Sequence, residues 1–362
     1  MFSLLLACTF GSPDSSDSVV DSGDRGLGVE GCHAQPRQAD EHDLWLAFPY
    51  TSAGGQADTW RRFRYSSAGL EELETVDVAR STGGRGAWTP DGEFLYLVDD
   101  SGVIHGPAGP WSELYASGLT VARSGEEAWV INPNWADSGG GVYRVDIDCD
   151  TGALGSPELL FTGKNTAAVV LRPGTESEAA IVTRELDGVF GMAHLVDLAT
   201  GETFQNIDAF GDDEAIVSDA AWDHEGQRLL VADYSEWSGV PTRVAVVEEG
   251  GPIGLVEVND PVSVVTAPWP GSSGAVVSGY GNAVYELQRD EAYSLGAKVA
   301  SPALPGSVVV VRQGALKGRV LVVENTGVQE LQLLEGGGVE DLGLLQSWSG
   351  LEGIPGAIAL QP

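Results

Sequence analysis

Basic residues are scarce in this chain of 362 residues, and its only lysines are Lys164, Lys298 and Lys317. The 53 acidic residues outnumber the 19 lysines and arginines, which gives a formal net charge of −34. Proteins that bind nucleic acid need clusters of basic side chains to neutralise the phosphates. The composition therefore excludes nucleic acid as a partner, and it also argues against adsorption to an anionic membrane surface.

Motifs for metal binding and catalysis are also missing. The chain has three cysteines without a CxxC pair, and its five histidines form no HxH, HxxH or HExxH pattern. It contains no GxSxG elbow and no GxxxxGK[ST] loop. Asp146, Asp148 and Asp150 lack the glutamate that completes a calcium loop, so they predict a turn between two strands. We therefore expect no metal and no cofactor, although a catalytic site assembled from several segments stays open.

The first 43 residues differ in composition from the rest of the chain. Residues 1–8 read MFSLLLAC, and no run of 18 or more apolar residues follows anywhere. Leu5 to Cys8 resembles the lipobox of bacterial lipoproteins, in which the cysteine becomes lipidated. Because no basic residue precedes Cys8, we expect a truncated signal whose true start lies upstream. Residues 9–43 are rich in Ser, Asp and Gly and predict an acidic tether.

Cys32 and Cys149 remain as an even pair if Cys8 carries lipid. In an oxidising compartment such a pair can form a disulfide. We therefore predict that Cys32 and Cys149 form a disulfide, which attaches the tether to the folded domain.

From residue 44 to residue 362 the sequence repeats a unit of short apolar strands and glycine turns. The clearest copies are GRGAWTPDGEFLYLVDDSGVIHG from Gly84 and SDAAWDHEGQRLLVADYSE from Ser218. The turn glycines recur about every 44 residues, as in propeller blades. One four-stranded sheet cannot bury both of its faces, whereas blades stacked around a ring can. The repeat predicts an all-β fold, a β-propeller of seven blades, with six or eight as alternatives.

The repeat WTPDGEFLYLVDD resembles those of the WD40-like, YVTN-type and TolB-like propellers. That resemblance implies the fold but no single function, because these families include scaffolds, lactonases and dehydrogenases. The chain ends in GIPGAIALQP, which matches only the first strand of a unit, while the stretch after residue 44 lacks its own first strand. We therefore predict that the C-terminal strand joins the N-terminal blade and closes the ring.

Candidate binding residues lie in the loops that join strands two and three of each blade, because these loops meet on one face of a propeller. Aromatic rings supply contact area there, and acids supply orientation. The candidate aromatic residues are Tyr50, Trp135, Tyr234, Trp237 and Tyr280. The candidate acids are Asp99, Asp100, Asp137, Asp233 and Glu236.

These observations predict a non-catalytic lipoprotein of the bacterial cell envelope whose propeller binds a protein or glycan partner. The lipid on Cys8 would be its only link to the membrane, and without that lipid the protein would be secreted. The alternative is a propeller hydrolase or lactonase with a metal or an acid–histidine site at the channel mouth. His105 and His194 are the histidines nearest such a position.

Overall fold

The computed structural model describes residues 29–37, 39–50, 56–78, 86–133, 140–186, 189–211, 215–234, 242–272, 274–279, 281–289, 292–349 and 355–362. Strands, turns and bends account for the regular structure of these residues, and none of them is helical. No helix long and apolar enough to cross a membrane occurs in this part of the chain.

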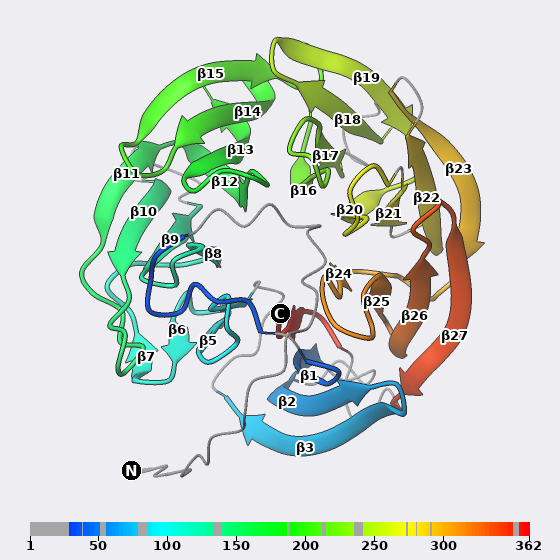
Figure 1. The fold of residues 1–362 in the computed structure, drawn as a ribbon, viewed down its shortest axis with the longest axis horizontal. Coiled ribbons are helices and arrows are strands. Elements are labelled where there is room, and N and C mark those ends of the chain that lie inside the picture. The colour runs from blue at the N-terminus through cyan, green and yellow to red at the C-terminus, as the bar shows by residue number, and fades with distance from the viewer. Residues whose placement is uncertain are drawn as a thin grey trace, which may run out of the picture.

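Seven four-stranded antiparallel sheets are arranged in a ring around a central axis (Figure 1), so the predicted seven-bladed β-propeller is confirmed. The strands of each blade follow, from the innermost outward. Blade 1 consists of β28 (Ile358–Leu360), β1 (His42–Tyr50), β2 (Gln56–Ser66) and β3 (Gly69–Asp77). Blade 2 consists of β4 (Ala87–Trp88), β5 (Leu95–Val98), β6 (Ile104–Gly106) and β7 (Gly109–Trp111). Blade 3 consists of β8 (Gly118–Val121), β9 (Glu127–Asn132), β10 (Gly141–Asp146) and β11 (Glu158–Thr162).

The remaining blades repeat the same order. Blade 4 consists of β12 (Lys164–Leu171), β13 (Glu178–Leu186), β14 (Val189–Asp197) and β15 (Glu202–Asp208). Blade 5 consists of β16 (Val217–Trp222), β17 (Leu229–Asp233), β18 (Arg243–Glu248) and β19 (Gly251–Glu257). Blade 6 consists of β20 (Pro261–Thr266), β21 (Gly274–Gly279), β22 (Ala283–Arg289) and β23 (Tyr293–Ala300). Blade 7 consists of β24 (Val308–Val310), β25 (Arg319–Glu324), β26 (Gly327–Leu333) and β27 (Val339–Ser347).

The C-terminal strand closes the ring, as predicted. β28 pairs antiparallel with β1, with Leu360 opposite Leu44 and Ile358 opposite Leu46. The two ends of the propeller are thereby held by main-chain hydrogen bonds, and β28 covers the inner edge of β1.

The hydrophobic core is divided among the junctions between blades, because each strand buries alternate residues against opposite neighbours. Leu44, Leu46 and Phe48 of β1 pack against blade 7, whereas Trp45 and Ala47 face blade 2. Six junctions hold extended clusters of buried side chains. At the junction of blades 1 and 2, the buried cluster of described residues consists of Ala47, Trp60 and Ala357. Among the described residues, this junction therefore has the smallest buried cluster of the seven.

Residues 29–37 and 39–41, here called the strap, cross one face of the ring from blade 3 towards blade 1 (the blue segment in Figure 1). The strap contacts the turn between the first two strands in three blades. His33 N donates to Ser124 O (3.2 Å) in blade 3, and Arg37 N donates to Pro90 O (3.4 Å) in blade 2. Ala315 N of blade 7 donates to Asp40 Oδ1 (3.3 Å). The face that carries these turns is called the turn face, and the opposite face, with the connections between strands two and three, is the loop face.

A disulfide joins Cys32 of the strap to Cys149 in the turn between β10 and β11. This is the pair predicted from the sequence, and its Cα atoms lie 5.9 Å apart. Gly125 is needed beside it, because its backbone has a φ of +73° and a Cβ there would lie 2.3 Å from His33 Cβ.

Candidate functional site

Most of the aromatic residues predicted to bind a ligand lie outside the described residues. Five of the predicted residues fall in loops that the structure does not describe, namely Trp135, Asp137, Glu236, Trp237 and Tyr280. Tyr50 ends β1, but its side chain is likewise outside the described part of the structure, and Cys8 precedes residue 29.

Two of the predicted acids are buried and hold the ends of strands. Asp99 Oδ1 accepts the backbone N–H groups of Ser101 (2.8 Å) and Val103 (3.0 Å). Asp233 Oδ1 accepts Ile216 N (2.9 Å), and its Oδ2 lies 3.4 Å from Arg243 Nε. Asp99 is 5% exposed and Asp233 is fully buried, so these carboxylates act inside the fold and do not form an acidic rim.

Asp100 and Tyr234 complete the predicted set. Asp100 is exposed, and Tyr234 is half-buried next to the end of β17. They belong to blades 2 and 5, which lie on opposite sides of the central axis (Figure 1), so the fold does not bring them together.

A cleft of about 540 Å³ occupies the junction of blades 1 and 2. We define the cleft by its principal lining residues Asp43, Trp45, Trp60, Arg62, Val76, Val78, Trp88, Glu93, Leu97 and His105. It forms where the core is thinnest, because blade 2 has strands of only two to four residues. Blade 1 has strands of nine to eleven residues in β1, β2 and β3, and blade 2 is too short to cover them.

Three indole rings dominate the walls of the cleft. Trp45 and Trp60 project from β1 and β2 on the side that faces blade 2, and Trp88 ends β4. The Nε1 atom of Trp88 is buried and has no hydrogen-bond acceptor among the described residues. Exposed or half-exposed tryptophan surface in a concave site is typical of ligand binding, because the ring offers a large apolar area and one polar donor.

The polar groups of the cleft include an ion pair, an imidazole and the carboxylate of Glu93. Arg62 donates through Nε to Asp43 Oδ2 (3.1 Å). His105 Nε2 lies 2.9 Å from Asp99 Oδ2, and its ring meets Trp60 edge-on with centroids 5.1 Å apart. Because a carboxylate can only accept, Nε2 of His105 is the donor in this pair, and in the neutral imidazole the lone pair is on Nδ1. The cleft thus combines apolar surface with one histidine whose orientation is fixed by an acid.

His194, the other histidine singled out from the sequence, cannot reach a substrate. It is fully buried, with Nε2 3.0 Å from Thr183 Oγ1 and Nδ1 2.6 Å from Asn206 Oδ1. Burial lowers the pKa of its imidazole. His194 serves as a hydrogen-bond partner for polar side chains on the neighbouring strands of blade 4.

A smaller cavity of about 240 Å³ lies along the innermost strands β8, β12 and β16. Thr166 and Asn165 contribute side-chain oxygens that are buried and have no partner among the described residues. The Arg184 guanidinium donates through Nε to Val217 O (2.9 Å) at the same place, and burial lowers its pKa. This cavity is more polar than the cleft.

The sequence reasoning missed the cleft, although one signal pointed to it. Trp45, Trp60 and Trp88 are three of the ten tryptophans and all belong to the first two blades. Their meeting depends on strands from three separate segments, so no local motif marks them.

Comparisons with known proteins identify the fold and no family. No family model and no curated protein sequence matches the chain. Hydrazine synthase from Kuenenia stuttgartiensis aligns with a TM-score of 0.62 and 14% identity, over 80% of this chain and 97% of that chain. A candidate 6-phosphogluconolactonase from Bacteroides fragilis aligns with a TM-score of 0.59 and 13% identity, over 89% and 98%.

A third propeller was solved in complex with a partner. Chaetomium thermophilum Sqt1, bound to the N-terminus of the ribosomal protein L10, aligns with a TM-score of 0.56 and 13% identity, over 86% of this chain and 88% of that chain. At this level of identity the three likenesses show the propeller fold alone.

Proposed function

We propose that this protein is a non-catalytic binding propeller whose cleft receives an apolar or aromatic side chain from a basic segment of a protein partner. The observation that carries the proposal is the incompletely filled junction of blades 1 and 2, where three indole rings line a hollow of about 540 Å³. Hot spots of protein interfaces are pockets of this kind, filled by one large side chain of the partner.

Charge supports a basic partner. The net charge of −34 attracts cationic segments and accelerates their encounter with the protein. Next to the cleft, β3 exposes Glu71, Glu72 and Glu74, while Val76 of the same strand lines the hollow. An apolar anchor flanked by lysine or arginine would match both features.

The location of the protein belongs to the same proposal. We place it in the bacterial cell envelope, anchored through a lipid on Cys8, or secreted if Cys8 is unmodified. The Cys32–Cys149 disulfide supports a compartment outside the reducing cytosol, where such bonds persist.

The test is a selection of random peptides displayed on phage against the immobilised full chain, followed by affinity measurements with the enriched peptides. Trp88→Ala should weaken binding about tenfold or more, because an interface tryptophan contributes on the order of 2 kcal/mol. Trp269→Ala removes a half-buried indole in blade 6, outside the cleft, and should leave the affinity unchanged.

Three outcomes would contradict the assignment. If Trp88→Ala binds like the wild type while Trp135→Ala or Trp237→Ala does not, the loop face is the binding surface. Specific binding to a glycan array that is lost in Trp88→Ala would show that the cleft takes a sugar. If the selection enriches no peptide that Trp88→Ala weakens, the cleft is not a peptide site.

One observation favours a second function, hydrolysis of an ester or lactone. His105 lines the cleft and is held by Asp99, so its Nδ1 could take a proton from a water molecule that attacks a carbonyl carbon. The binding proposal predicts no turnover of ester or lactone probes. Turnover that is lost in His105→Asn, with the affinity for the probe retained, would establish the enzyme instead.

A further inference from the structure

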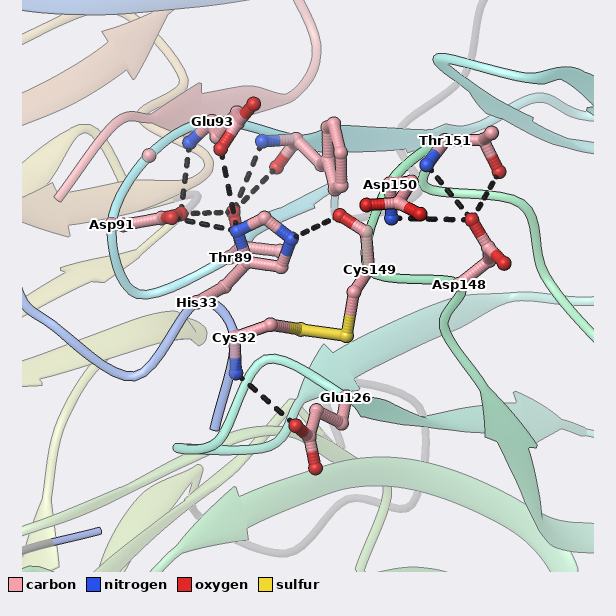
Figure 2. Close-up of polar contacts among 12 residues, drawn as sticks. Cys32, His33, Thr89, Asp91, Glu93, Glu126, Asp148, Cys149, Asp150 and Thr151 are labelled. Atoms are coloured by element: carbon pink, nitrogen blue, oxygen red, sulfur yellow. Dashed lines mark hydrogen bonds and ion pairs between the residues drawn. A yellow bond between two sulfur atoms is a disulfide. The ribbon is translucent and has the colours of Figure 1, made fainter. Parts of the chain in front are cut away.

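Three side chains with metal-ligating atoms meet on the turn face, and one of them, Glu93, also lines the cleft. His33 Nδ1, Asp91 Oδ2 and Glu93 Oε2 lie within 4.8 Å of one another (Figure 2). Nδ1 is 2.7 Å from the oxygen of Asp91 and 3.4 Å from that of Glu93. His33 belongs to the strap, and both acids belong to the turn between β4 and β5, so the cluster joins two separate parts of the chain.

The imidazole of His33 is oriented so that Nδ1 faces the acids. Its Nε2 lies 3.0 Å from the backbone oxygen of Cys149 and its Nδ1 lies 2.7 Å from Asp91 Oδ2. Because a carbonyl and a carboxylate only accept, both ring nitrogens donate in this arrangement, and a bound metal would take the place of the proton on Nδ1. The ring also packs edge-on against Phe94 at 4.6 Å, and His33 is 4% exposed. Histidines that bind metals are commonly held in this way, with the second ring nitrogen donating to a carbonyl.

The carboxylate of Asp91 is also held in a fixed orientation by hydrogen bonds. Its Oδ1 accepts Thr89 Oγ1 (2.7 Å) and Glu93 N (3.0 Å), which leaves Oδ2 directed at His33. A carboxylate fixed through one oxygen presents the other without a loss of rotamer freedom on binding, so the ligand atoms are preorganised.

We propose that His33, Asp91 and Glu93 bind a divalent transition metal, with Zn²⁺ as the ion that fits best and water completing its coordination. In a tetrahedral site with bonds of about 2.0–2.2 Å, neighbouring ligand atoms lie about 3.3 Å apart. The separations of 2.7 and 3.4 Å from Nδ1 require only small movements of the two acids. A site with an imidazole nitrogen selects Zn²⁺ over Mg²⁺ and Ca²⁺, which prefer oxygen.

The metal would form a second link between the strap and the propeller. The disulfide attaches Cys32 to blade 3, whereas the metal attaches the next residue, His33, to blade 2. Cys32 and Cys149 cannot serve as ligands while they are oxidised, and the site therefore consists of one nitrogen and two carboxylate oxygens.

Calorimetric titration of Zn²⁺ into the full chain tests this inference, after chelator treatment, with the disulfide intact and Mg²⁺ in millimolar excess. The excess Mg²⁺ occupies weak sites on the acidic surface. One Zn²⁺ per chain should bind, and Glu93→Gln and His33→Asn should each weaken it about tenfold or more. His224→Asn removes an imidazole outside the cluster and should change nothing. Co²⁺ in place of Zn²⁺ should give a visible absorption band that Glu93→Gln alters.

Two results would overturn the proposed metal site. Weak binding of several ions, unchanged in Glu93→Gln, would mean that the acidic surface alone attracts Zn²⁺ and would overturn the site. Displacement of Zn²⁺ by Mg²⁺ or Ca²⁺ at equal concentration would overturn it as well. Because Glu93 is 63% exposed, Glu93→Gln leaves the fold intact and carries the test even if His33→Asn does not fold.

Discussion

Cys32 and Cys149 are separated by 117 residues and joined by a disulfide, which fixes the strap over the turn face of a closed ring. The bond connects a segment outside the blades to the turn between β10 and β11. It therefore restrains a part of the chain that blade packing alone does not hold.

Removing this bond should release the strap and lower stability. We expect the double variant Cys32→Ser/Cys149→Ser to lose about 2–4 kcal/mol in the free energy of unfolding, because a cross-link over a long loop restricts the unfolded chain. Denaturant titration measures the loss, and limited proteolysis should cut the strap first. Equal stability of the variant and the wild type would contradict this expectation.

Removing residues 353–362 should prevent folding. The deletion takes away β28, including the buried Ile358, and exposes the main-chain edge of β1. We expect aggregation or loss of the cooperative unfolding transition, measured by size-exclusion chromatography and circular dichroism. Deleting Pro362 alone is the control and should be tolerated; a folded monomer without β28 would refute closure of the ring.

Acidification should destabilise the protein through His194. Burial lowers the pKa of this imidazole, so the folded state binds its proton less readily than the unfolded state does. The neutral imidazole of His194 contributes fully to the free energy of unfolding above the pKa of about 6.5 that it has in the unfolded chain. This contribution is lost as the pH falls towards the lowered pKa of the folded state. His42, whose pKa burial also lowers, acts in the same direction.

The measurement is the free energy of unfolding from pH 7.5 to 5 for the wild type and for His194→Asn. The wild type should lose more stability over this range than the variant. Imidazole NMR shifts give a check that does not depend on the variant, since His194 should remain neutral at pH values where an exposed histidine is half protonated. A His194 that titrates near 6.5 would disprove the assignment.

The stability of the junction between blades 5 and 6 should depend on Asp219. Its Oδ2 accepts Ser263 Oγ (2.7 Å) and Val264 N (2.9 Å), and the residue is 1% exposed. Asp219→Ala removes the carboxylate oxygen that these two buried donors share, so we expect a loss of about 3 kcal/mol in the free energy of unfolding. Asp150→Ala, at an exposed turn, should cost less than about 0.5 kcal/mol. Equal costs at the two positions would rule out this role.

Local chemistry explains why so much of the fold could be predicted. The turns at Pro90–Gly92 and His224–Gly226 connect strands as expected, and Gly92 and Gly226 have the positive φ that favours glycine. Asp148 accepts the N–H groups of Asp150 and Thr151 in the turn predicted there. The alternation of strand residues and the choice of turn residues depend on only a few neighbouring positions, so both can be recognised in the sequence. Counting the strands in each repeat then shows that the last strand has no partner within its own unit.

The sequence by itself predicted the blades, seven in number with six or eight as alternatives, and the closing strand, because each prediction rests on neighbouring residues and on a repeated period. The tertiary structure decided which side chains meet. Asp99 accepts backbone N–H groups of the turn that follows it, and Asp233 accepts the N–H of Ile216 before β16, since the direction of a carboxylate depends on nearby backbone that the pattern does not show. The cleft and the His33–Asp91–Glu93 cluster exist only because segments far apart in sequence pack together, one where a short blade leaves space and the other where the strap crosses a turn.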